Sequence, residues 1–157
     1  MQVLQRKVTA GFSMSTTYRT WHDISSFNIN ITPSSTASRI LVFVSVSLAS
    51  SNVADHLAVR GIRDSSSIIG NHTSLSGRSP AFTGHHTTAN EHNLAVYSGG
   101  TVLDHPNSTS AVNYKVQGYG GGETFYMNRP KTDNANDLHY SRGVSTLTLM
   151  EVTGNTQ

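Results

Sequence analysis

Histidine is the residue type with the most evident chemistry in this chain, which has eight histidines and no cysteine. Successive side chains of an extended segment point to opposite faces, so two adjacent histidines chelate a metal poorly, and no His-x-His pair is present. We therefore predict a polar surface loop, with no metal and no cofactor, for the four histidines close together in sequence: His72, His85, His86 and His92. The alternative is a three-fold histidine site on the axis of a trimer.

Enzyme chemistry has little support in the sequence. A Ser-His-Asp triad can be assembled on paper because serine and histidine abound, but the chain has no Gly-x-Ser-x-Gly elbow. A glycosidase needs two carboxylates across the scissile bond, and the chain holds only nine acidic residues. We interpret the candidates as solvated loop carboxylates and predict that the chain is not an enzyme: Asp55, Asp64, Glu91 and Asp104.

Two further patterns have a binding alternative. The glycine-rich run Gly118–Gly122 lies between two strand patterns, whereas a phosphate cradle opens a helix, so it predicts a hairpin turn. Five aromatic residues favour core or interface positions, with a sugar-binding surface as the alternative: Trp21, Tyr97, Tyr114, Tyr119 and Tyr126.

The element that positions the rest of the chain is the apolar run Arg39–Leu48. Its β-branched residues favour a strand, and it is far shorter than the roughly 20 residues of a membrane-spanning helix. One face of that strand is entirely apolar: Ile40, Val42, Val44, Val46 and Leu48. The opposite face begins with Leu41 and Phe43, so we predict a central strand with a second, half-buried face.

Short alternating segments follow one another along most of the chain, and none predicts a helix. Candidate strands include residues 2–8, 27–31, 56–63, 92–97, 112–117, 123–128 and 143–152. The segment Asp64–Asn90 is polar and predicts a long loop. This spacing is typical of an all-β, antiparallel β-sandwich. We predict an N-terminal arm over residues 1–18 and a single β-sandwich domain over residues 19–157.

Charge excludes some partners. Charged residues make up 13% of the chain, and the net charge is +2 with no basic cluster. A protein that neutralises a phosphate backbone needs such a patch, so we predict neither a nucleic-acid nor a membrane partner.

Several motifs, in their order, resemble a family of virion proteins from tailed phages of aquatic bacteria, namely cyanophages and pelagiphages. The matching segments are Thr20-Trp21-His22-Asp23-Ile24, Ile31-Thr32-Pro33-Ser34-Ser35, Ser38-Arg39-Ile40-Leu41-Val42, Leu103-Asp104-His105-Pro106, Asn113-Tyr114-Lys115-Val116-Gln117, Asn128-Arg129-Pro130 and Ser145–Val152. The resemblance implies a jelly-roll-like domain, usually trimeric, on the outside of a phage particle. It brings no catalytic residues.

The function we predict is that of a structural virion protein that decorates and cements the capsid. Its partners would be itself, as a homotrimer, and the major capsid protein. The alternative is a tail-fibre or spike tip that binds a host surface glycan. The predicted subunit or capsid interface combines the arm, the second face of the central strand and the apolar last strand: Val3, Leu4, Leu41, Phe43, Leu147 and Leu149.

Overall fold

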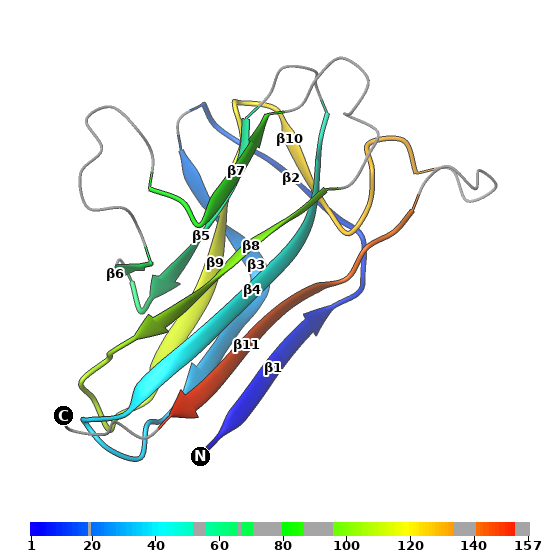
Figure 1. The fold of residues 1–157 in the computed structure, drawn as a ribbon. Helices are drawn as coiled ribbons and strands as arrows, with labels where there is room; N and C mark the ends of the chain where they lie inside the picture. Colours follow the sequence, from blue (N-terminus) through cyan, green and yellow to red (C-terminus); the bar gives the residue numbers. More distant parts are fainter. Residues whose placement is uncertain are drawn as a thin grey trace.

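The computed structural model describes residues 1–18, 20–51, 56–65, 67–70, 80–86, 96–133 and 141–152, and in these ranges every regular element is a strand (Figure 1). The all-β prediction is confirmed. The strands are β1 (Val3–Val8), β2 (Phe12–Ser15), β3 (Trp21–Ile31), β4 (Arg39–Ser50), β5 (His56–Arg63), β6 (Ser67–Ile69), β7 (Thr83–His86), β8 (Val96–Asp104), β9 (Val112–Tyr119), β10 (Thr124–Met127) and β11 (Ser145–Val152).

The strands form two sheets, and every strand pair is antiparallel. Sheet A has the order β1-β11-β4-β10-β2, with β8 on the other edge of β4. Sheet B has the order β3-β9-β5-β6, with β7 also paired to β5. The two sheets lie face to face as the layers of a sandwich (Figure 1).

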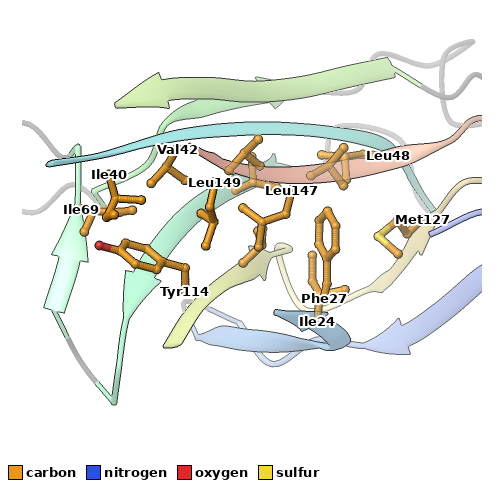
Figure 2. Packing of buried hydrophobic residues seen from close by; sticks show 14 of the residues in the cluster. Ile24, Phe27, Ile40, Val42, Leu48, Ile69, Tyr114, Met127, Leu147 and Leu149 are labelled. Atoms are coloured by element: carbon orange, nitrogen blue, oxygen red, sulfur yellow. The ribbon is translucent and has the colours of Figure 1, made fainter. Parts of the chain in front are cut away.

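The core fills the space between the sheets, and β4 contributes its most continuous face. The predicted apolar face of this strand is buried along its whole length. Figure 2 shows Val42 of β4 near Leu149 of β11, and Leu147 and Leu48 further along the same layer, facing side chains of sheet B such as Phe27. The central-strand prediction is confirmed, because β4 is paired on both edges.

A bulge in β3 keeps its apolar residues facing inward. Ile24 and Phe27 are three positions apart, and in a regular strand they would point to opposite faces. The register between β3 and β9 shifts between Asp23 and Asn28, and Ser26 has a φ of 59°. Between these two pairs β3 has more residues than β9, so the strand turns locally and both Ile24 and Phe27 are buried.

One edge of β4 changes partner along its length, from β11 to β10, and Asn128 fills the junction. Its backbone N–H donates to the Ser47 carbonyl at 3.0 Å, and its side-chain amide donates to the Val8 carbonyl at 2.7 Å. The Ser145 hydroxyl donates to the Asn128 side-chain oxygen at 2.6 Å. Asn128 has a φ of 60°, a conformation that asparagine adopts more readily than most residues.

The first eighteen residues do not form a separate arm. β1 pairs with β11 from Val3 to Val8, and β2 pairs with β10. Leu4 and Val8 pack against the core, as expected for a first strand. The arm prediction failed because the partner of β1 lies at the opposite end of the sequence, where no local pattern reveals it.

The glycine-rich segment connects the two sheets instead of closing a hairpin. β9 lies in sheet B, whereas β10 pairs with β2 and β4 in sheet A. A Cβ on Gly118 would lie 2.9 Å from the Phe125 ring, so glycine permits the close packing at this crossing. The predicted turn is present, and Gly122 has a φ of 108°, but the predicted strand partner is wrong.

Two other sequence predictions change. The described part of Asp64–Asn90 contains β6 and β7, both paired with β5, where we predicted only a loop. The strand predicted over residues 92–97 is, in its described part, the start of a longer strand, β8, which continues through Gly99 to Asp104. A Cβ on Gly99 would collide with the Val44 carbonyl oxygen of β4, so this glycine permits a close approach of strands.

Candidate functional site

The outer face of sheet A carries a row of apolar side chains that crosses four strands. The register places Val3 of β1 opposite Met150 of β11, Met150 opposite Leu41 of β4, and Leu41 opposite Leu103 of β8. Phe43 lies on the same face in the next row. Exposure is 53% for Val3, 52% for Leu103 and 38% for Phe43. We give the name apolar row to the four residues that are paired across the strands together with Phe43 beside them: Val3, Met150, Leu41, Leu103 and Phe43.

The neighbours of the apolar row on this face are polar, and charges begin one row further out, at Arg39 of β4 on one side and Lys7 of β1 on the other. The adjacent cross-strand row consists of Gln5, Thr148, Phe43 and Thr101, and the Gln5 amide donates to the Thr148 hydroxyl at 2.9 Å. Burying a charged group without a partner is costly, and neither of these two rows contains one. A partner that covers only these two rows can therefore do so without leaving a charge unpaired.

The structure divides the predicted interface residues into two groups. Val3, Leu41 and Phe43 belong to the apolar row. Leu147 and Leu149 are buried in the core, and Leu4 packs against it, so these three side chains face away from the outer surface. Sequence reasoning missed Met150 and Leu103. Met150 could have been found from the alternation of β11, because it points to the face opposite Leu149. Leu103 could not, because it becomes a neighbour of Leu41 only through the register of β8 with β4.

The outer face of sheet B is different, because it carries a chain of polar contacts. The Arg60 Nε donates to the Gln117 side-chain oxygen at 2.8 Å, and the Gln117 amide donates to Asp23 at 2.6 Å. The Lys115 ammonium donates to the second Asp23 oxygen at 2.7 Å. Partial burial raises the pKa of Asp23, but these hydrogen bonds outweigh it and hold the pKa below its usual value.

Two aromatic rings lie beside this polar chain. Trp21 and Tyr119 are cross-strand neighbours with ring centroids 5.3 Å apart. The Arg60 guanidinium lies 4.4 Å from the centre of the Trp21 ring, which is cation–π geometry. Burial lowers the pKa of Arg60, and Asp23 partly offsets this effect. The cation is therefore partly removed from water.

The other predicted aromatic residues do not join this cluster. Tyr114 is buried in the core (Figure 2). Tyr97 is exposed on sheet A, and Tyr126 lies under Arg129. The structure thus brings together only Trp21 and Tyr119 of the five.

The candidate carboxylates that the structure describes have structural partners. Asp104 binds Arg63 at 2.8 Å and accepts a hydrogen bond of 2.6 Å from the Tyr114 hydroxyl. Burial, followed by this bond to Asp104, raises the pKa of Tyr114. Asp64 accepts a hydrogen bond from the Asn113 backbone. Two further candidates, Asp55 and Glu91, lie outside the described residues.

Two of the four candidate histidines are described, and both lie on β7. His86 faces His56 of β5, with ring centroids 4.7 Å apart. His85 points to the opposite face, and His72 and His92 lie outside the described residues. Among the residues that the structure describes, no three histidine or acidic side chains are grouped as metal ligands would be.

Glu151 is a fully buried carboxylate that no sequence pattern singles out. It accepts hydrogen bonds from the Ser34 backbone N–H at 2.6 Å, from the Ser34 hydroxyl at 2.7 Å and from the Gln2 amide at 3.1 Å. The bonds from Ser34 are the main cause of the lowered pKa, which is about 2. Glu151 thereby fixes the connection between β3 and β4 to the end of β11.

No protein-family model matches the chain, and a search of curated proteins finds none with significant similarity. In the part of the chain that the structure describes, no helix is long and apolar enough to cross a membrane.

Proposed function

We propose that the fold is a jelly roll. Four antiparallel pairs support this assignment: β1 with β11, β3 with β9, β4 with β8, and β5 with β7. These pairs nest inside one another along the chain, as in one long hairpin wound into two sheets. The jelly roll is an eight-stranded fold of this kind that occurs in viral capsid and lectin domains. On this view β2, β6 and β10 are additions at the edges.

We propose that the protein is a structural component of a phage virion, and that it decorates and cements the capsid as a homotrimer. The observation that carries the proposal is the apolar row on the outer face of sheet A. Exposed apolar patches with polar rims mark association surfaces. The occupant we propose is a second copy of the chain, because a capsid lattice presents three-fold and six-fold positions at which identical subunits meet.

The trimer can be tested by replacing two exposed members of the apolar row that lie on neighbouring strands, Phe43 of β4 and Leu103 of β8. In light scattering at micromolar concentration, the wild-type protein is expected at three times the chain mass. The double variant Phe43→Ser, Leu103→Ser is expected to be a monomer with a retained cooperative melt, because both side chains are largely outside the core. Val144→Ser, an exposed apolar residue outside the row, is the matched control. A monomeric wild type would contradict the proposal.

If the protein decorates the capsid, it should be present in many copies in each virion. In purified virions, quantitative mass spectrometry is expected to give a copy number close to that of the major capsid protein. A cement protein also raises the temperature at which capsids open, so virions lacking it are expected to open at lower temperature. A copy number as low as that of tail components would contradict the capsid assignment.

The second candidate function is a tail-fibre or spike tip that binds a host surface glycan. The aromatic and charged cluster on sheet B favours it, because sugar sites combine a ring face with oriented polar groups. Antibody labelling in electron micrographs separates the two functions: label over the head supports decoration, and label confined to the tail supports the fibre tip.

A further inference from the structure

We propose that the outer face of sheet B binds an acidic saccharide, with Arg60 holding the carboxylate and the Tyr119 ring supporting the sugar. The site comprises Trp21, Ala58, Arg60, Gly84 and Tyr119, on β3, β5, β7 and β9 (Figure 1). This site lies on the face opposite the apolar row. Binding there is compatible with a position of the protein on the head or on the tail.

Arg60 has donors that no group in the described part of the chain uses. Its Nε is bonded to Gln117, and its guanidinium is stacked on Trp21. Within the described residues, its two terminal nitrogens make no hydrogen bond to any other group. Arg60 is also half-buried, so solvent satisfies these donors less fully than on an open surface. A stacked, immobilised guanidinium with an open fork matches a carboxylate in bidentate geometry.

The surface around Arg60 and Lys115 carries more positive than negative charge. Among the residues that the structure describes, Asp23 is the only carboxylate in this network, and it already accepts from Lys115 and Gln117. Within the described part of the chain, Arg60 and Lys115 therefore face a single acidic group, and these three residues together carry one positive charge in excess. An anionic ligand is favoured over a neutral one for this reason.

The surface beside Tyr119 is formed by small residues. Its cross-strand neighbour on β5 is Ala58, and the neighbour of Ala58 on β7 is Gly84. The row thus passes from two large rings to two of the smallest residues. This leaves a step at which one flat side of a sugar ring can lie on the strands with its edge against Tyr119. A Cβ added at Gly84 would meet only ordinary contacts, the nearest at 3.5 Å, so a side chain can be introduced there.

The chain supplies its own probe for this site, because Trp21 is its only tryptophan. Adding oligoalginate, a polyuronate, to the full-length protein is expected to change the tryptophan fluorescence saturably, whereas maltohexaose, a neutral sugar, is expected to leave it unchanged. Affinity electrophoresis in gels containing alginate gives an independent readout. Absence of both fluorescence change and retardation with oligoalginate would overturn the proposal.

Two variants locate the binding. Arg60→Gln removes the guanidinium donors, and Gly84→Leu fills the space beside Tyr119 without removing a donor. Each is expected to weaken binding at least about tenfold while the protein keeps a cooperative thermal transition. Lys7→Gln on sheet A removes the same charge as Arg60→Gln and is expected to bind like the wild type. Equal weakening by Lys7→Gln would overturn the proposal, as would equally tight binding of polyglutamate, since the surface would then recognise any polyanion.

Discussion

Replacing Val44 with aspartate (Val44→Asp) is expected to leave the chain unable to fold. Val44 is 6% exposed and lies on the core face of β4, between Leu147 of β11 and Gly100 of β8. None of the described core residues carries a positive charge that could pair with a carboxylate there, and burying it unpaired costs several kcal/mol. Domains have a free energy of unfolding of only about 5–15 kcal/mol, so this cost is a large part of the total stability.

The matched control for this variant is Ser45→Asp. Ser45 is the next residue, but it points to the half-exposed outer face, so its carboxylate stays in contact with water. We expect Ser45→Asp to be soluble with a cooperative thermal transition, and Val44→Asp to be insoluble or to lack one in circular dichroism. A Val44→Asp protein that melts cooperatively near the wild-type temperature would contradict the central position of β4.

Glu151 is expected to make the protein sensitive to acid. Its pKa is about 2 in the folded protein against 4.5 for the unperturbed group. A lowered folded-state pKa contributes stability above pH 4.5, and this contribution is lost as the pH falls from 4.5 towards 2. The lowering of the Glu151 pKa corresponds to about 3 kcal/mol of folding stability at neutral pH.

The variant Glu151→Gln isolates this contribution from that of the other carboxylates. Urea unfolding at pH 7 is expected to show a loss of about 3 kcal/mol relative to the wild type, and the difference should fall by roughly half at pH 3. Glu123→Gln, at an exposed position, serves as the control and is expected to change stability little at either pH. A difference that stays constant from pH 7 to pH 3 would show that Glu151 does not act through its charge.

The sequence allowed the central strand to be predicted because its face is defined locally. Five alternating apolar residues fix which side of β4 is buried, whatever its neighbours are. The apolar row could be predicted only in part, since it depends on the register of four strands. Leu41 and Phe43 follow from β4 alone, but Leu103 and Met150 become their neighbours only after β8 and β11 have paired with it.

Glycine explains several of the wrong predictions. Gly99 and Gly118 look like turn residues in the sequence, yet both lie within strands, where they allow a neighbouring strand or ring to come close. Glu151 was missed for a related reason. A single acid in an apolar strand has no periodicity, and its partners Ser34 and Gln2 are far away in sequence.

The pairing of β1 with β11 has a consequence for the timing of folding. During synthesis the first strand leaves the ribosome long before its partner, and β4 must likewise wait for β8, β10 and β11. Folds dominated by such distant pairings fold slowly, on the millisecond-to-second scale. Until the last strand is made, the most apolar segment of the nascent chain has open edges, so it depends on dilution or chaperones to avoid pairing with another copy.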